Sequence, residues 1–251
     1  MSFPEGSKVW SKLVLIASLI CVFSVFVAIF GVRLGAFNFR VASDMLESTL
    51  QAAIPVLLVA VIIFVGEAET RIKTGAAIVI LLFPIIGIWV NQPPAPSLNE
   101  QGQRLAALND ISTDTQNPPQ FEAVMSMRPA TSNSVIYPEN GAKIQAERFA
   151  DIQPIRSDLT QKEAYENALA LVDQYGWELV LADESQGRIE AVASTFFFNF
   201  KDDVVIRIRS EQKVSIIDIR SHSRLGKGDR GKNAERVRAF IRDFNQVAKE
   251  E

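Results

Sequence analysis

Three long stretches without a charged residue dominate the first part of the chain. They cover about residues 13–32, 48–66 and 74–92. Twenty helical residues span about 30 Å, which is the thickness of the hydrocarbon core of a bilayer. Because a backbone in hydrocarbon must form its hydrogen bonds within its own segment, each stretch predicts a transmembrane helix. Together the three helices would form a membrane domain over residues 1–91.

The first apolar stretch resembles a signal peptide only in part. Lys8 and Lys12 give it a basic start, but the stretch exceeds the usual apolar core of about 7–15 residues. Gly31-Val32-Arg33 also lacks the small residues of a cleavage site. We therefore expect the stretch to remain in the mature protein.

The acidic residues of the membrane domain flank the apolar stretches. They are Asp44, Glu47, Glu67 and Glu69, apart from Glu5 at the start of the chain. A transport or proton pathway usually places an ionisable group at mid-depth in the membrane. The pattern therefore predicts an anchor, and transport is the less favoured interpretation.

The basic residues of the flanking segments predict the orientation. Lys8, Lys12, Arg71 and Lys73 would lie on one side of the membrane, and Arg33 and Arg40 on the other. Because Lys and Arg in short loops favour the cytoplasmic side, the N-terminus is predicted to be cytoplasmic. Three crossings would then place the C-terminal domain outside the cytoplasm, which in a bacterium is the periplasm. We predict an integral protein of the inner or plasma membrane.

The chain changes character after the third stretch. Residues 1–98 hold 6 Lys and Arg, whereas residues 99–251 hold 20. Gln92-Pro-Pro-Ala-Pro96 begins a Pro-rich linker predicted over 92–108, because adjacent prolines favour a stiff, extended backbone. Between 109 and about 157 the pattern is irregular. It predicts short strands and turns that pack across the later elements.

The pattern becomes regular after Thr160. Thr160 and Glu163 form a capping box, and the helix that they begin is expected to end at Gly176. Strands are predicted at 177–181, 188–198, 203–209 and 213–221. A last helix carries an apolar stripe of Ala234, Val237, Phe240, Ile241 and Phe244. Residues 109–251 are therefore predicted to form a soluble α+β domain, with a helix, about four antiparallel strands and a helix.

The turn between the last two strands determines which residues face each other. A tight turn at Glu211-Gln212 would place Val204 opposite Ile219 on the apolar side of the sheet. On the outer side the same turn would place Asp203 opposite Arg220.

The outer side of this strand pair has two open interpretations. Arg207 would lie diagonal to Asp218 there, which suits either a self-satisfied ion-pair network or a surface that faces a ligand. Val214 and Ile216 point to the same side. Their presence indicates that the face is partly covered, for example by segment 109–125.

Composition narrows the possible functions. One Cys and one His exclude a disulfide framework, a Cys-based zinc site and a site with several histidines. A net charge of −3 and a pI near 5.4 argue against nucleic acid binding. We expect no metal and no cofactor.

Gly226-Lys-Gly-Asp-Arg-Gly231-Lys232-Asn233 has the spacing of a phosphate-binding loop. Such a loop needs Ser or Thr after the lysine to hold magnesium, and Asn233 stands there instead. The sheet is also predicted to be antiparallel. We therefore expect no nucleotide, and we interpret the glycines as a turn in which Asn233 or Asp229 caps the last helix.

The highest local density of positive charge lies between Arg220 and Arg242. Eight basic residues there accompany only Asp229 and Glu235. A helix N-terminus with basic neighbours suits an anion such as a lipid phosphate or a carboxylate. A solvated helix face is the simpler interpretation, because most charge runs have that role.

His222 is the only histidine, and it lies between Ser221 and Ser223. Adjacent residues of a strand point to opposite faces, so neither serine is well placed to use His222 as a base. The acidic pairs Asp202-Asp203 and Asp183-Glu184 lack the partners of a catalytic or metal site. We therefore expect no catalytic residue.

Five blocks in the second half resemble one family. The segment Leu108–Phe121, LNDISTDTQNPPQF, resembles the opening motif of the family called domain of unknown function 1499. The other similar blocks are 187–195, 200–208, 219–226 and 229–240. The resemblance covers roughly residues 105–245 and implies no known activity, cofactor or catalytic residue.

The resemblance also implies a shared polar set in this domain. Its members are Asp110, Thr113, Asp114, Arg207, Asp218, Arg220, Ser223, Arg224, Asp229, Asn233 and Arg236. It does not imply whether the set forms a scaffold or a pocket.

These observations favour a non-enzymatic, membrane-anchored envelope protein whose domain binds an anionic ligand, a lipid head group or an envelope partner. The candidate ligand-binding residues are Arg207, Arg220, Arg224, Arg236, Asn233 and Asp114, which would converge on a concave pocket. The alternative is a structural or assembly module in which these residues pair with carboxylates and bind no small molecule. A hydrolase or transferase of unknown type comes third. The expected partners are the lipid bilayer and an anionic lipid or envelope protein.

Overall fold

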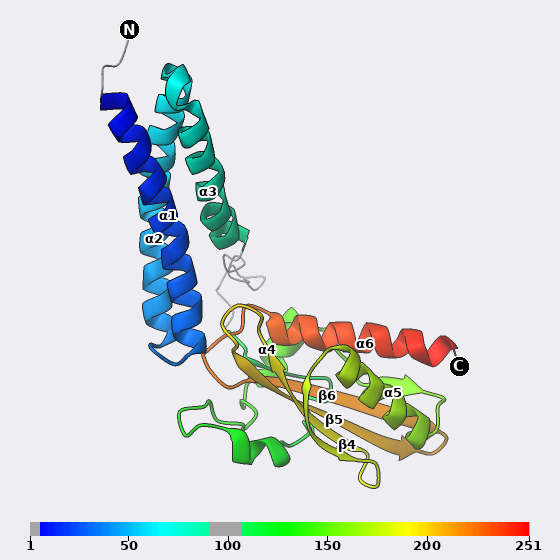
Figure 1. Ribbon diagram of the computed structural model, residues 1–251. Coiled ribbons are helices and arrows are strands. Elements are labelled where there is room, and N and C mark those ends of the chain that lie inside the picture. The colour runs from blue at the N-terminus through cyan, green and yellow to red at the C-terminus, as the bar shows by residue number, and fades with distance from the viewer. Residues whose placement is uncertain (1–5, 91–106, 251) are drawn as a thin grey trace. The chain divides into compact units, whose positions relative to one another are not determined.

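The computed structural model describes residues 6–90 and 107–250, and the chain divides into two compact units, residues 1–93 and 94–251 (Figure 1). Nearly all of the predicted linker, 92–108, lies outside the described residues.

The first unit consists of three long helices. They are α1 (Gly6–Arg33), α2 (Phe39–Gly66) and α3 (Arg71–Val90), with the short 3₁₀ helix η1 (Ala68–Thr70) before α3. All three are long and apolar enough to cross a membrane, by length and composition. This confirms the three predicted helices. Helix α2 begins earlier than its apolar stretch because the Asn38 side chain accepts a hydrogen bond from the Val41 backbone and caps the helix there.

Small side chains line the contacts between these helices. Ala28, Ala53, Ala60 and Ala77 are fully buried, which lets the helix backbones approach closely. The hydroxyl groups of Ser24 and Thr49 form a hydrogen bond of 2.9 Å between α1 and α2. The large apolar side chains of these helices mostly point outward, as expected for helices surrounded by lipid.

The second unit is an α+β domain built on one antiparallel sheet. Its helices are η2 (Ala123–Met127), α4 (Gly141–Arg148), α5 (Gln161–Gln174) and α6 (Lys232–Glu250). Its strands are β1 (Asp110–Ser112), β2 (Ile155–Ser157), β3 (Glu178–Asp183), β4 (Arg188–Ser194), β5 (Lys201–Glu211) and β6 (Val214–Ser223). The sheet order is β1-β6-β5-β4-β3, and β2 also pairs with β6. The predicted helix, four strands and helix are confirmed, although the strand predicted at 188–198 ends at Ser194. The short strands expected in the irregular segment are β1 and β2, whereas its helices η2 and α4 were not predicted.

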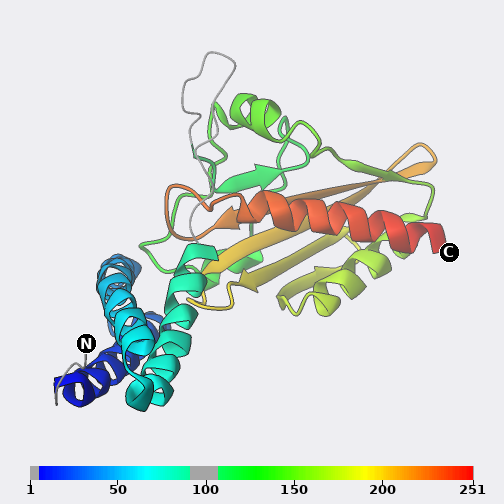
Figure 2. The same ribbon diagram turned by 90° about the horizontal axis from the view of Figure 1, so that it is seen from above.

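Helices α5 and α6 cover one face of the sheet (Figures 1 and 2). The capping box of Thr160 and Glu163 begins α5, as predicted. The apolar stripe of α6 packs against the sheet through Val237, Phe240 and Phe244, each of which is fully buried. This face is the main hydrophobic core.

The predicted register of the last two strands was wrong by two residues. The turn lies at Gln212-Lys213, one position later than expected, and Gln212 has a positive φ of 57°. Consequently Ile206 faces Ile219 and Arg207 faces Asp218 directly. A shift of two keeps every side chain on its predicted face, because the side-chain period of a strand is two.

The irregular segment covers the opposite face of the sheet. Phe121 and Val124 pack there against Val192 and Val205. The expectation that the 109–125 segment covers this face is therefore confirmed. The cover removes from water the charged side chains that point from the sheet toward it.

Candidate functional site

Charged side chains lie buried between the sheet and segment 113–137. We call this set of side chains the polar layer. Its members on the sheet are Asp110 (β1), Glu190 (β4), Asp203 and Arg207 (β5), and Asp218, Arg220 and His222 (β6), with Arg224 just after β6. Strand alternation places these residues on one face, because members of one strand are an even number of positions apart and the paired strands bring Asp110 and Asp203 opposite His222, and Arg207 opposite Asp218. Glu190 belongs to the same face because it lies opposite Val205, two positions from both Asp203 and Arg207.

Arg220 is the centre of the polar layer. Its side chain is fully buried, and its Nε and Nη2 donate to the two carboxylate oxygens of Asp110 at 2.9 and 2.7 Å. Nη1 donates to the Pro119 carbonyl at 3.0 Å, and Nη2 also donates to the Val135 carbonyl at 2.7 Å. These bonds use four of the five N–H groups of the guanidinium.

Two aromatic rings enclose the Arg220 guanidinium. The rings of Phe121 and Tyr137 have their centroids 4.9 and 5.5 Å from its central carbon. Such contacts are more favourable away from water. Burial, reinforced by the Asp110 carboxylate, raises the pKa of Tyr137 to about 12, so its hydroxyl stays protonated at neutral pH.

Asp203 joins two further arginines of the polar layer. Its carboxylate is fully buried and accepts from Nε and Nη2 of Arg224 at 2.9 and 2.7 Å. The other carboxylate oxygen pairs with Arg128 of the covering segment. Asp203 therefore fastens both the loop after β6 and the segment after η2 to the sheet.

Arg207 forms the edge of the polar layer. Its Nη2 lies 2.7 Å from the buried Asp218 carboxylate and 3.0 Å from Asp114, and it donates to the Asn117 carbonyl at 3.1 Å. The Asp114 carboxylate in turn accepts from the backbone of Gln116 and Asn117. Asp114 thus shapes its own loop while it pairs with the sheet.

Arg236 and Asn233 lie on the other face of the sheet, at the start of α6. Arg236 donates to Asp202 at 2.7 Å and to the Ser221 hydroxyl at 2.9 Å. Asn233 is fully buried and donates to the Asn109 carbonyl at 3.0 Å and to the Ser223 hydroxyl at 2.9 Å. These bonds attach the first turn of α6 to the ends of β1 and β6.

Asp229 caps the beginning of α6, which was one of the two predicted caps. Its carboxylate accepts from the backbone of Gly231 at 2.8 Å and of Asn233 at 2.6 Å. Burial raises the pKa of this carboxyl group, and the two backbone donors oppose that effect. The glycine-rich segment is therefore a helix-capping turn.

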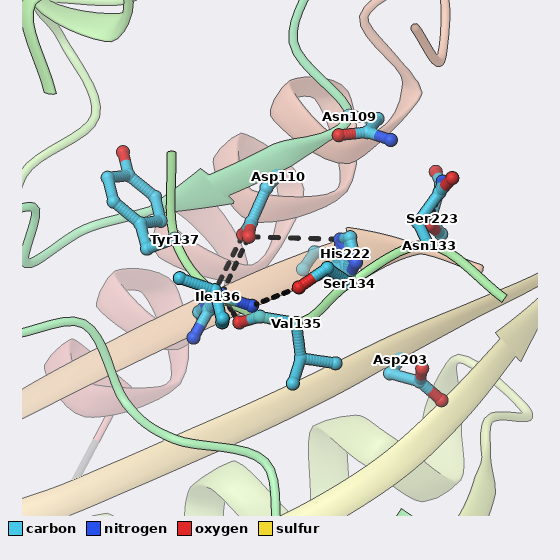
Figure 3. Close-up of polar contacts among 12 residues, drawn as sticks. Asn109, Asp110, Asn133, Ser134, Val135, Ile136, Tyr137, Asp203, His222 and Ser223 are labelled. Atoms are coloured by element: carbon cyan, nitrogen blue, oxygen red, sulfur yellow. Dashed lines mark hydrogen bonds and ion pairs between the residues drawn. The ribbon is translucent and has the colours of Figure 1, made fainter. Parts of the chain in front are cut away.

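His222 occupies the middle of a row of three residues across the sheet. It pairs with Asp110 on β1 and with Asp203 on β5 (Figure 3). Its Nδ1 lies 3.7 Å from Asp110, which is too long for a hydrogen bond, and neither ring nitrogen has a hydrogen-bond partner among the described residues. Ser221 and Ser223 lie on the opposite face, as predicted, so no nucleophile is aligned with the ring.

The surroundings of His222 favour its neutral form. Burial lowers its pKa, and Arg220 and Arg128 lower it further, while Asp110 and Asp203 act in the opposite direction. Two carboxylates already face three guanidinium groups in this part of the polar layer, counting Arg224. A proton on the ring would add to that positive surplus.

We expect the domain to lose stability as the pH falls below about 6.5. The unfolded histidine gains its proton near that pH, whereas the folded one resists it until a lower pH, so acid favours the unfolded state. The slope cannot exceed about 1.4 kcal/mol per pH unit for one proton. Hydrogen exchange of the β5–β6 amides in the detergent-solubilised full chain measures it.

The variant His222→Gln isolates this contribution. It should flatten the dependence of the unfolding free energy on pH between pH 7.5 and 5.5, relative to the unchanged chain. Asp229 has the opposite effect on this pH dependence, because its raised pKa makes the folded state lose stability as the pH rises above 3.8. An unchanged slope in His222→Gln would show that the histidine is not responsible.

The six candidate ligand-binding residues do not gather at one point. Arg207, Asp114, Arg220 and Arg224 belong to the polar layer, whereas Arg236 and Asn233 lie on the helix-covered face. Each of the four arginines is ion-paired with a carboxylate. Two hollows in the described structure, one between α1 and α2 and one beside α4, are lined by none of the six.

Two important polar residues were missed in the sequence. Glu190 is fully buried and accepts from the backbone N–H groups of Glu122 and Val124, at 2.9 Å each, which holds η2 on the sheet. Its alternation with Arg188, whose Nε donates to it at 2.8 Å, was a usable signal of a paired strand face. Arg128 had no such signal, because its partner Asp203 lies far along the chain.

The described residues offer no group of three or more His, Cys, Asp or Glu side chains that could hold a metal ion. The polar layer is thus built from arginine–carboxylate pairs, one neutral histidine and backbone carbonyls. It can hold segments of the chain together, and it presents no aligned acid, base and nucleophile.

A comparison with known families gives one match for this domain. The model of a family described as a protein of unknown function (DUF1499) matches residues 110–244. A comparison with curated proteins found no match. The matched range begins at Asp110 and includes every residue of the polar layer.

Proposed function

This chain belongs to the DUF1499 family of proteins of unknown function, and from that premise we propose that it is a membrane-anchored envelope protein whose α+β domain acts through contacts. In this proposal the domain is a structural or assembly module that binds a protein or lipid partner and catalyses no reaction. The polar layer is its internal scaffold.

The environment of Arg220 supports this proposal most directly. A fully buried guanidinium that donates four hydrogen bonds to the protein has little capacity left for an external anion. Opening the site would break a bidentate ion pair with Asp110 and uncover two aromatic rings. The other arginines of the polar layer are committed in the same manner to Asp203 and Asp218.

A titration with inorganic phosphate tests this proposal. We expect no rise in the thermal midpoint of the full chain in detergent, beyond the rise that sodium chloride of equal ionic strength causes. A ligand that binds the folded state would raise it in proportion to its concentration over the dissociation constant. If phosphate raises the midpoint specifically and Arg207→Ala abolishes the rise, the polar layer is a binding site.

A second candidate function is the binding of an anionic head group outside the polar layer. Lys227 and Arg230 lie at the exposed turn before α6, and the exposed Lys232, which pairs with Glu235, is the first residue of the helix. The neighbouring Asp229 uses its carboxylate on backbone N–H groups. This candidate needs no change in the buried ion pairs.

The proposed orientation places the N-terminus in the cytoplasm and the α+β domain outside it. It is supported by Lys8, Lys12, Arg71 and Lys73 on one side, against Arg33 and Arg40 on the other. We expect alkaline phosphatase fused after residue 100 to be active and the same fusion after residue 70 to be inactive. The opposite activities would reverse the orientation, and green fluorescent protein fused at the same sites provides the reciprocal control.

A further inference from the structure

Two exposed loops emerge together from one end of the sheet, here called the loop end. They are residues 195–200, between β4 and β5, and residues 224–231, between β6 and α6. Ser194 pairs with Lys201, and the Arg224 backbone N–H donates to the Lys201 carbonyl at 3.1 Å. The two loops are therefore neighbours by direct backbone contact.

The loop end displays large apolar side chains. Phe196 is 85% exposed, Leu225 53% and Phe197 47%. The rings of Phe196 and Phe197 meet edge to face with their centroids 5.3 Å apart. An aromatic cluster at a loop tip contributes little to the hydrophobic core. An exposed apolar cluster of this kind indicates a surface that contacts another molecule or a membrane.

The net exposed charge beside this cluster is positive. Lys227 and Arg230 are exposed in the second loop, and Lys232, exposed at the start of α6, forms an ion pair of 2.7 Å with the exposed Glu235. The one acidic residue of that loop, Asp229, is turned inward to cap α6. Phenylalanine and leucine side chains next to lysine and arginine are a combination that favours binding at the interface of an anionic bilayer.

The chain also enters the domain at the loop end. The Asn109 side chain donates to the Gly226 carbonyl at 2.7 Å, and the Ser223 backbone donates to the Asn109 carbonyl at 2.8 Å. Residues 91–106 separate this point from α3 in the sequence, a contour length of at most about 55 Å. A covalent tether of this length keeps the loop end at a high effective concentration near the bilayer.

We propose that the loop end docks on the surface of the bilayer that α1, α2 and α3 span. Phe196, Phe197 and Leu225 enter the interfacial region, and the lysines and arginine contact anionic phospholipid head groups. This inference rests on the proposed membrane anchor and adds a second, reversible contact to it. In this proposal the partner that the domain contacts through the loop end is the lipid bilayer.

A fluorescent reporter in the full chain tests this inference. Cys21 is first replaced by serine, and Leu225→Cys then carries a bimane dye in nanodiscs of phosphatidylcholine and phosphatidylglycerol that contain a nitroxide-labelled lipid. The matched control places the dye at Gln212→Cys, in the turn at the other end of the same strands. Strand β5 has 11 residues, so the two reporters are separated by about 35 Å.

We expect the nitroxide lipid to quench the dye at residue 225 at least twofold more than the dye at residue 212. The double variant Phe196→Ser/Phe197→Ser should abolish the difference, and Lys227→Glu or phosphatidylcholine alone should reduce it. Equal or absent quenching at both positions would overturn the docking while leaving the anchor intact. Protection of residue 225 from iodide without lipid quenching would indicate a protein partner and would also overturn it. Failure of the chain to remain in nanodiscs would refute the anchor itself.

Discussion

Replacing Arg220 with alanine lowers the free energy of unfolding of the α+β domain by about 3–5 kcal/mol, according to the geometry of the polar layer. The change leaves the Asp110 carboxylate buried without its charged partner, and a buried unpaired charge is far more costly than a lost surface contact. It also removes the cation between the rings of Phe121 and Tyr137. Hydrogen exchange of the β5–β6 amides in the full chain measures the loss.

Two variants make this expectation specific. Arg242→Ala is the matched control, because Arg242 is exposed and its ion pair is with its sequence neighbour Asp243, so the exchange rates should not change. Arg220→Lys keeps the positive charge but cannot reproduce the bidentate bond or the ring stacking, so it should also be destabilising. A loss below 1 kcal/mol in Arg220→Ala would show that the arginine is not a structural centre and would strengthen a ligand-binding role.

Replacing Asp203 with alanine has a comparably large expected effect, about 3–5 kcal/mol, for the converse reason. Arg224 and Arg128 would then lie in a buried region without the carboxylate that neutralises both. The covering segment should respond first, because Asp203 holds it through Arg128. We expect exchange at residues 123–135 to increase more than exchange in α5.

The control for this variant is Asp151→Ala. Asp151 also pairs with an arginine, Arg238, but both side chains are substantially exposed, so the domain should retain its stability. A uniform rise in exchange across the domain would mean that Asp203 supports the whole sheet. Unchanged exchange at residues 123–135 would contradict the proposed fastening of the covering segment.

The buried ion pairs of Arg220 and Asp203 also distinguish a scaffold from a ligand-binding site. If the polar layer were a ligand site, variants of its arginines would lose binding while the domain stayed folded. If it is a scaffold, loss of stability precedes any other effect. Comparing phosphate-dependent and phosphate-independent stability in Arg220→Ala therefore separates the two interpretations of the polar set that the sequence left open.

Local features of the chain were predicted well from the sequence. The three apolar stretches predict α1, α2 and α3 because a spanning helix needs only length and the absence of charge within one segment. The capping box at Thr160 predicts the start of α5, and the stripe through Phe240 predicts the buried face of α6. All these signals lie within about twenty consecutive residues.

The long-range partners of the polar layer could not be predicted in this way. Sequence alternation placed Arg220 on the covered face, but its partner Asp110 is 110 positions away and becomes its partner only when β1 pairs with β6. The register of β5 and β6 depended on the position of a two-residue turn, which displaced the predicted pairs by two residues. His222 lies between the carboxylates of Asp110 and Asp203 only because β6 pairs with both β1 and β5.

The sequence by itself determined the membrane helices, the order of helices and strands after Thr160, and which face the residues of the last two strands occupy, because these follow from hydrophobic period and local capping. Only the tertiary structure decided that the arginines are committed to buried carboxylates and divided between two faces of the sheet. The physical reason is that an ion pair depends on the meeting of side chains distant in the chain, whereas a helix or strand depends on neighbours.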